Sequence, residues 1–187
     1  MKIDWAKIGI RDLSGLICEI LRKKGIDATL VGGACISIYS DNRYISGDLD
    51  FITYSSTKEI EEIFTPLGFL RKSRRHFEHP ECRFFIEFPA PPIAIGNELI
   101  KDYQSIKTKF GIIRMLTPTD CVRDRLAAYF FWGDMQSLEQ ALMVANRQNI
   151  NIEVIKKWAL KEGASKELNK FLSKLKKTKT SSQLQTT

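Results

Sequence analysis

The sequence lacks long apolar runs, paired cysteines and the features of a secretory leader. Because no stretch of about 18 apolar residues is present, neither a membrane span nor a membrane partner is expected. The first 21 residues place acids and apolar side chains at helical spacing, without the continuous apolar segment and cleavage site of a signal peptide. No CxxC motif occurs, and the isolated, apolar settings of Cys18, Cys35, Cys82 and Cys121 are typical of reduced, buried thiols. These absences together predict a cytoplasmic protein.

The composition is that of an ordinary globular chain with a basic end. Apolar residues make up 43% and charged residues 27%, and 187 residues suffice for one well-cored domain with a small helical extension. The net charge is +7, and residues 165–187 hold six lysines but one acid. This end either solubilises the protein or attracts nucleic acid. The rest of the chain is only mildly basic, which argues against a dedicated nucleic-acid-binding surface.

Hydrophobic periodicity and capping residues predict helices and strands in the first two thirds and helices afterwards. Helices are expected at 11–24, 34–40, 56–68, 117–132, 134–148 and 151–163, and strands at 28–31, 48–54, 69–79, 81–92 and 111–118. We therefore predict an α+β fold, a mixed β-sheet flanked by helices with a C-terminal helical segment. The expected divisions are a sheet-containing domain at 1–116, packed helices at 117–175 and a disordered basic tail at 176–187.

Two aspartates interrupt a strand pattern in the stretch RYISGDLDF. Because strand side chains alternate, Asp48 and Asp50 point to one face, about 6.5–7 Å apart, while Leu49 and Phe51 point into the core. Two like charges this close raise one pKa unless a cation lies between them. Hard ions such as Mg²⁺ prefer carboxylates together with substrate phosphates. The pair therefore predicts a metal site, and the alternative is a solvated sheet edge.

Two further features would complete such a site. Gly32 and Gly33 end an apolar run ahead of a predicted helix, where glycines let a ligand approach the backbone and helix-start N–H groups bind an anion. Glu87 stands between apolar neighbours in RFFIEFP, and its alternative is a structural ion pair with Arg83 or Arg114. A phosphate-approach turn and three convergent carboxylates are the apparatus of two-metal phosphoryl or nucleotidyl transfer.

The stretch LVGGACISIYSDNRYISGDLDF resembles the signature of the DNA polymerase β-type nucleotidyltransferase superfamily: an apolar residue, Gly-Gly or Gly-Ser, a spacer and Asp-x-Asp. Its RYISGDLDF part is most similar to the small AbiEii-like and minimal nucleotidyltransferases, which often belong to toxin–antitoxin or phage-defence pairs. The later stretch MLTPTDCVRDRLAAYFFWGDMQSLEQALMVA also resembles that group. The resemblance covers roughly residues 28 to 145. It implies a nucleotidyltransferase fold, with 1–116 as the catalytic domain.

Carried over by position, the resemblance implies that Asp48 and Asp50 ligate Mg²⁺ or Mn²⁺ and that Glu87 is the third ligand and the base. Family members usually carry Asp at that third position. Contacts with the nucleotide are implied for six residues: Gly32, Gly33, Arg43, Ser46, Arg125 and Asp134. Of these, Arg125 stands near the position of a family lysine and Asp134 near that of a family aspartate.

The implied activity is metal-dependent transfer of a nucleoside monophosphate from a nucleoside triphosphate, such as ATP, to a hydroxyl acceptor. The acceptor stays open among a protein, a tRNA or other RNA end and a small molecule. A partner protein or a second copy of the chain is expected to help form the acceptor site. The alternatives are a catalytically inactive antitoxin-like binding module, for which Glu87 would point away or be sealed, and an antibiotic nucleotidyltransferase, which expects an acidic acceptor pocket.

The segment HFEHPEC raises the alternative of a zinc site through His76, His79 and Cys82. A structural zinc ion takes four ligands, and only three are local, so an exposed hairpin tip is preferred. The basic cluster at 71–75 either guides a phosphate-rich substrate or is a solvated edge strand. The aromatic run at 129–132 is interpreted as core.

Overall fold

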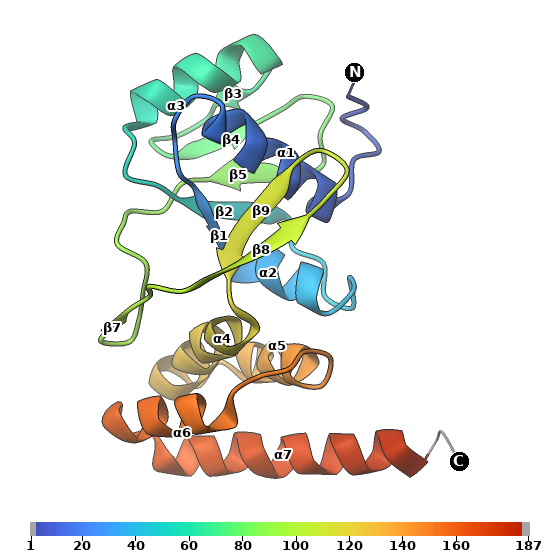
Figure 1. Ribbon diagram of the computed structural model, residues 1–187, viewed down its shortest axis with the longest axis vertical. Coiled ribbons are helices and arrows are strands. Elements are labelled where there is room, and N and C mark those ends of the chain that lie inside the picture. Colours follow the sequence, from blue (N-terminus) through green and yellow to red (C-terminus); the bar gives the residue numbers. More distant parts are fainter. Residues whose placement is uncertain (1–2, 185–187) are drawn as a thin grey trace.

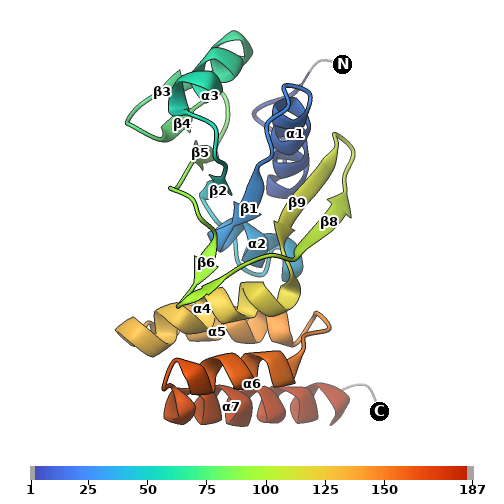
Figure 2. The same cartoon turned by 60° about the vertical axis from the view of Figure 1, so that its left-hand side comes forward.

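A β-sheet with helices on it forms one part of the molecule, and a stack of helices forms the other (Figure 1). The computed structural model describes residues 3–184. Helices α4 to α7 lie beneath the sheet, and α6 and α7 are the elements farthest from it (Figures 1 and 2). The predicted α+β fold, a mixed sheet flanked by helices with a C-terminal helical segment, is confirmed.

The main sheet of the described chain has the strand order β3-β4-β5-β2-β1-β9-β8. The strand bounds are Thr29–Val31 (β1), Asp48–Ile52 (β2), Leu70–Arg71 (β3), His76–Glu78 (β4), Phe85–Glu87 (β5), Ala94–Ile95 (β6), Glu98–Leu99 (β7), Tyr103–Lys107 (β8) and Ile112–Leu116 (β9). Strand β2 runs antiparallel to β1 and parallel to β5, whereas β1 runs parallel to β9. The strand that carries the two aspartates is therefore central. Strands β6 and β7 pair separately as a small hairpin.

Two of the helices, α3 and α4, begin at the capping residues that the sequence predicts. Their bounds are Ile10–Arg22 (α1), Gly32–Tyr39 (α2), Thr57–Phe64 (α3), Thr65–Leu67 (the 3-10 turn η1), Pro118–Trp132 (α4), Met135–Ala145 (α5), Ile152–Lys161 (α6) and Ser165–Leu184 (α7). At α3, the Ser56 hydroxyl accepts the Glu59 N–H while the Glu59 carboxylate accepts the Ser56 N–H, which forms a capping box. At α4, Thr117 accepts the Asp120 N–H and Pro118 takes the first helical position.

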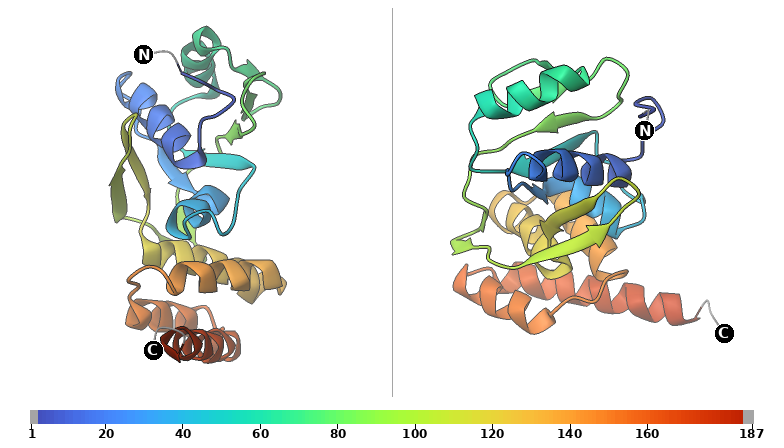
Figure 3. Two further views of the ribbon diagram at one scale, coloured as in Figure 1. Left: turned by 90° about the vertical axis from the view of Figure 1, so that its right-hand side faces the viewer. Right: turned by 45° about the horizontal axis from the view of Figure 1, so that its top comes forward.

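One face of the sheet is buried under α1 and α3, which lie side by side over it in Figure 3. Leu49 and Phe51 of β2 are fully buried on this face, as their alternation with the aspartates predicts. Phe64 of α3 packs against Phe77 and Phe88, with ring centroids 5.3 and 5.6 Å apart. This aromatic packing fixes β2, β4 and the end of β5 on the side of α3 and leaves their opposite face for the acids.

The helical part is joined to the sheet through α2. The Tyr39 hydroxyl donates to the Leu116 carbonyl at 2.6 Å, and the Gln148 side chain donates to the Tyr39 carbonyl at 2.8 Å. Deeper in the stack, the buried Trp158 ring stacks on Phe130 with centroids 5.4 Å apart. The aromatic run at 129–132 is core only in its first half, because Phe131 and Trp132 are exposed.

The single strand predicted at 69–79 is wrong, because this segment is a hairpin of β3 and β4. The Lys72 N–H donates to the His76 carbonyl at 2.9 Å and closes the turn. The Arg71 guanidinium binds the Ser73 carbonyl at 3.1 Å within the same turn. The Arg71 side chain therefore favours a turn here, since it satisfies carbonyls of the turn instead of lining an extended strand.

The disordered tail predicted at 176–187 is also wrong for much of its length, because α7 continues to Leu184. Lys174 Nζ lies 2.6 Å from Glu139 Oε1, so α7 is held against α5 where the tail was expected to begin. A helix that is already nucleated extends easily, one backbone hydrogen bond per added residue. Residues 185–187 of the predicted tail lie outside the described residues.

Three of the four cysteines have the buried setting that the sequence predicts. All four cysteines are free; Cys18, Cys35 and Cys121 are buried, and Cys82 is half-buried. Burial raises the pKa of the Cys18 thiol to about 11, so this group stays protonated at neutral pH. Across residues 3–184, none of the helices combines the length and apolar character needed to cross a membrane.

Candidate active site

The three predicted carboxylates lie on one face of the sheet. Asp48 and Asp50 alternate with the buried Leu49 along β2, and Glu87 ends the neighbouring β5. The two strands are parallel, with Asp50 paired to Glu87 and Asp48 paired to Phe85. Paired residues of adjacent strands point to the same face. Glu87 therefore points with the two aspartates and not away from them.

The electrostatics of Asp50 show that the carboxylates are close enough to repel one another. Burial, followed by the charges of Asp48 and Glu87, raises the pKa of Asp50 to about 7. Arg125 acts in the opposite direction and lowers this pKa. Mutual repulsion of this kind is what a bound cation relieves.

The two glycines make room for polar side chains of the site. Gly32 has a φ of +66°, and its neighbour Val31 is paired with Asp50 across β1 and β2. A Cβ on Gly32 would collide with a carboxylate oxygen of Asp50, and a Cβ on Gly33 would lie 2.5 Å from Ser46 Oγ. Packing against Asp50 and Ser46 therefore requires glycine at both positions, which the sequence did not predict. Their contacts with a nucleotide stay a prediction.

Ser46 orients the first aspartate. Its hydroxyl donates to Asp48 Oδ1 at 2.5 Å, and its N–H donates to Ser37 Oγ at 2.9 Å. The residue is buried, so this geometry is fixed from within the protein. Arg43 lies exposed in the loop between α2 and β2. For both Ser46 and Arg43, contact with phosphates stays a prediction.

Arg125 lies near the carboxylates, whereas Asp134 has a structural role. The Arg125 guanidinium contacts Asp124 Oδ2 at 3.0 and 2.5 Å. Burial is the largest single influence on the pKa of Arg125 and lowers it, but the charge and hydrogen bond of Asp124, together with Cys121 and Cys35, outweigh burial and raise this pKa. Asp134 caps α5, where its carboxylate accepts the Ser137 hydroxyl at 2.6 Å, and this hydrogen bond lowers the pKa of Asp134. Of these two predicted residues, Arg125 is therefore the one whose charge lowers the pKa of Asp50.

Sequence reasoning missed His76 as a residue of the site. Its Nδ1 lies 2.9 Å from Glu87 Oε1, its Nε2 lies 2.8 Å from Glu78 Oε1, and its ring stacks on Phe85 with centroids 4.6 Å apart. The hydrogen bond to Glu87 raises the pKa of His76. Alternation places positions 76 and 78 on one strand face, but the pairing of β4 with β5 cannot be read from one sequence.

Glu87 is not paired with an arginine, which was its alternative role. In the described structure its ion-pair partner is His76, while Arg83 and Arg114 each lie over an aromatic ring. The Glu87 side chain is 42% exposed, so it is open to a ligand. The arrangement required for the inactive module, with Glu87 turned away or sealed by an arginine, is not found.

The donor set fits a hard divalent ion that arrives with phosphates. Among the described residues, no group of three or more His, Cys, Asp or Glu side chains is arranged to hold a metal by itself. Asp48 is engaged by Ser46, and Glu87 is engaged by His76. Carboxylate oxygens suit Mg²⁺ or Mn²⁺, and Mg²⁺ usually completes its shell with water and substrate phosphates. Two aspartates on one strand meet that requirement without a preformed cage.

The zinc alternative is not supported. His76 faces Glu87 and Glu78, whereas the His79 ring packs on Trp5 with centroids 4.5 Å apart. These histidines therefore serve different surroundings and do not converge with Cys82 on one ion.

A scan against protein-family models finds no match, and a search of curated proteins finds none either. Among solved structures, the chain is similar to an antigenic nucleotidyltransferase-like protein from Paracoccidioides brasiliensis. The TM-score is 0.58 at 13% identity, over 90% of this chain and 88% of that one. The antibiotic-resistance factor ANT(2'')-Ia gives a TM-score of 0.43 at 11% identity, over 94% of this chain and 95% of that one. This score is too low to support a shared fold. The likeness concerns the fold alone: this chain has a nucleotidyltransferase-like fold.

Proposed function

We propose that the protein is a metal-dependent nucleotidyltransferase that moves a nucleoside monophosphate from a nucleoside triphosphate to a hydroxyl acceptor. The observation that carries this proposal is the register of β2 and β5, which sets Glu87 beside Asp50 on the face shared with Asp48. Mg²⁺ or Mn²⁺ is the proposed cofactor, and a nucleoside triphosphate such as ATP is the proposed co-substrate. By sequence resemblance we also assign the chain to the small AbiEii-like group and to a toxin–antitoxin or defence context.

The proposed reaction is a displacement at the α-phosphorus of the triphosphate. The acceptor oxygen forms a bond to this phosphorus, the bond from the phosphorus to the bridging oxygen of the β-phosphate breaks, and pyrophosphate leaves with that electron pair. The proton of the acceptor hydroxyl passes to Glu87, which acts as the general base. A divalent ion held by Asp48 and Asp50 would neutralise phosphate charge and polarise the α-phosphate.

Neighbouring residues orient each of the three carboxylates or make room for it. The Ser46 hydroxyl fixes the orientation of Asp48, and the missing side chain of Gly32 leaves space for Asp50. His76 holds Oε1 of Glu87, so Oε2 is the oxygen that we assign to the acceptor proton. The carboxylates are thus oriented by their immediate neighbours, which is how catalytic groups are held in productive geometry.

The test begins with nucleotide binding. We would titrate a non-hydrolysable nucleoside triphosphate analogue into the protein by calorimetry, with and without Mn²⁺. Wild type is expected to bind only with the metal, and the double variant Asp48→Asn/Asp50→Asn is expected to lose this binding. The exposed Asp102→Asn is the control for each of the two substitutions, because it removes one carboxylate charge away from the site.

Transfer is then followed with triphosphates labelled on the α- or the γ-phosphate, using total RNA and cell lysate as acceptors. Nucleotidyl transfer moves the α-label to the acceptor and leaves the γ-label in pyrophosphate. Transfer of the α-label that survives the double substitution would exclude the proposed site. Nucleotide binding that needs no metal, without any transfer, would instead support the inactive binding module.

A further inference from the structure

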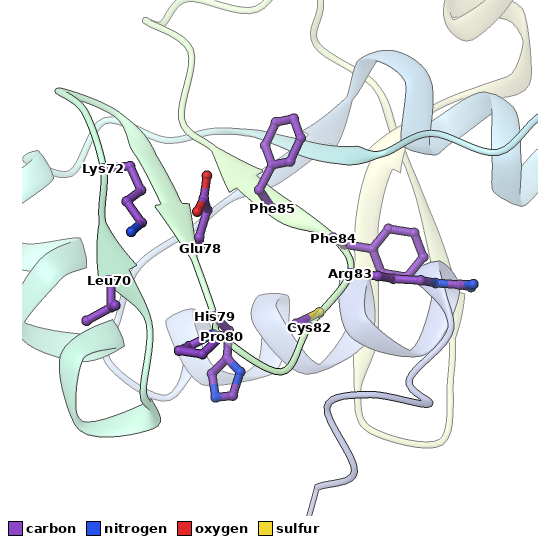
Figure 4. Close-up of a pocket in the computed structure, with 9 residues that line it drawn as sticks. All are labelled: Leu70, Lys72, Glu78, His79, Pro80, Cys82, Arg83, Phe84 and Phe85. Atoms are coloured by element: carbon purple, nitrogen blue, oxygen red, sulfur yellow. The ribbon is translucent and has the colours of Figure 1, made fainter.

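A cavity of about 480 Å³ lies over β3, β4 and the loop that leads into β5 (Figure 4). Its lining includes Leu70, Lys72, Glu78, Arg83, Phe84 and Phe85. Its volume lies within the range of small-molecule binding sites. The residues proposed for the metal and the triphosphate do not line this cavity, which we call the β3–β5 cavity.

The β3–β5 cavity opens on the same sheet face as the three carboxylates. Phe85 is paired with Asp48 across β2 and precedes Glu87 by two positions on β5. Glu78 binds one nitrogen of His76, and the other nitrogen of that ring holds Glu87. In the strand order, the cavity lies beyond β5, whereas the glycine turn follows β1 on the other side of β2. A triphosphate at the glycine turn therefore leaves the cavity side for the acceptor.

The lining combines the aromatic ring of Phe85 with two cations, and His76, which does not itself line the cavity, supports that ring. The Phe85 ring stacks on His76 with an angle of 26° between the planes. Lys72 and Arg83 lie on opposite sides of the cavity in Figure 4. The one acid that lines it, Glu78, is engaged by His76. Aromatic rings bind nucleobases by stacking, and cations bind phosphates. A polycationic sugar would require acids that this cavity does not present.

We propose that the β3–β5 cavity binds the acceptor and that the acceptor is the end of a single-stranded nucleic acid. Its terminal base would stack on the Phe85 ring, which His76 supports, and its phosphates would contact Lys72 and Arg83. That the bound strand is the acceptor rests on the proposed function, whereas its binding to the cavity does not. Outside residues 165–187 the chain is only mildly basic, so it offers few contacts for the phosphates of a long duplex. The proposed site therefore binds the end of a strand and not the length of a duplex.

Binding is measured by fluorescence anisotropy with a short, labelled, single-stranded oligoribonucleotide, without metal or triphosphate. Phe85→Leu keeps an apolar side chain but removes stacking, so affinity should fall about fivefold to a hundredfold, and Phe85→Tyr should restore it. Lys72→Glu and Arg83→Glu should each reduce the slope of log affinity against log salt by about 0.7 or more. Lys170→Glu on α7 makes the same charge change far from the cavity and should leave affinity within about twofold.

The outcomes separate this inference from the proposed function. Binding that is retained in Asp48→Asn/Asp50→Asn and lost in Phe85→Leu and Lys72→Glu supports the cavity, even if no transfer occurs. Binding that is absent, or equal in all variants, overturns it. Label transfer to a protein, or to a small molecule, that is unaffected by Phe85→Leu and Lys72→Glu also overturns it while leaving the nucleotidyltransferase proposal intact. Circular dichroism of each variant confirms that the fold is retained.

Discussion

Asp50 is predicted to make the folded protein less stable at alkaline pH than a neutral side chain would. Its pKa rises from 3.8 to about 7 in the folded state, through burial and the charges of Asp48 and Glu87. Each pKa unit corresponds to about 1.4 kcal/mol, so the ionised side chain costs up to about 4 kcal/mol of folding free energy. The substitution Asp50→Asn keeps the shape of the side chain and should recover most of this amount.

The direction of the pKa shift sets the pH dependence. The folded protein binds this proton more tightly than the unfolded chain, so stability is lost as pH rises from 3.8 through about 7. Asp50→Asn should therefore stabilise strongly at pH 8 and very little at pH 4. In a chain of this size, about 4 kcal/mol corresponds to a rise in Tm of roughly 10 °C. Urea unfolding and thermal melts at both pH values, in the presence of a chelator, measure the difference.

Two comparisons make this prediction sharp. Asp102→Asn, an exposed aspartate, should change the unfolding free energy by less than about 0.5 kcal/mol at either pH. Added Mg²⁺ should raise the Tm of wild type at pH 8 more than that of Asp50→Asn, because the ion relieves a repulsion that the variant lacks. A variant that is no more stable than wild type at pH 8, or equally stabilised at pH 4, would refute the account of Asp50.

Two other substitutions probe the surroundings of the site, and a third probes a buried ion-pair cluster on α4. Gly32→Ala should destabilise by about 2 kcal/mol or more in urea unfolding, because its φ is positive and its Cβ would meet Asp50, whereas Gly9→Ala has open space and should be nearly neutral. Ser46→Ala should weaken Mn²⁺ affinity about tenfold by calorimetry; unchanged affinity would contradict its orienting role. Arg123→Met leaves the carboxylates of Glu98 and Asp120 without their buried partner and should lower the unfolding free energy by about 3 kcal/mol. A decrease under about 1 kcal/mol would contradict this.

The local order of the chain could be predicted because its signals are local. Capping residues located α3 and α4, since a side-chain oxygen three residues ahead of a helical N–H is visible in the sequence. Period-two alternation likewise placed Asp48 and Asp50 opposite Leu49 and Phe51. What alternation cannot give is the neighbour of a strand. The pairing of β2 with β5, and of β4 with β5, joins segments far apart in the chain and required the structure.

Two misses have physical reasons of their own. Strand β8 was not predicted because YQSIK is an edge strand with no fully buried side chain, so it carries no apolar alternation. The glycines were predicted to face a ligand, but a sequence cannot show that Gly32 also accommodates Asp50 from the adjacent strand. Both features depend on contacts between segments, which composition and spacing do not record.

The alternation that builds the site also ties it to the fold. Between and after the two aspartates, Leu49 and Phe51 are fully buried, and each such side chain contributes about 1.5–3 kcal/mol through burial. This opposite face offsets the repulsion at Asp50, so the strand can carry a destabilising charge without unfolding. A one-residue slip of β2 would move the acids into the core and Phe51 to the surface. The same slip would separate Asp50 from Glu87, so the packing that excludes it also preserves the convergence of the carboxylates.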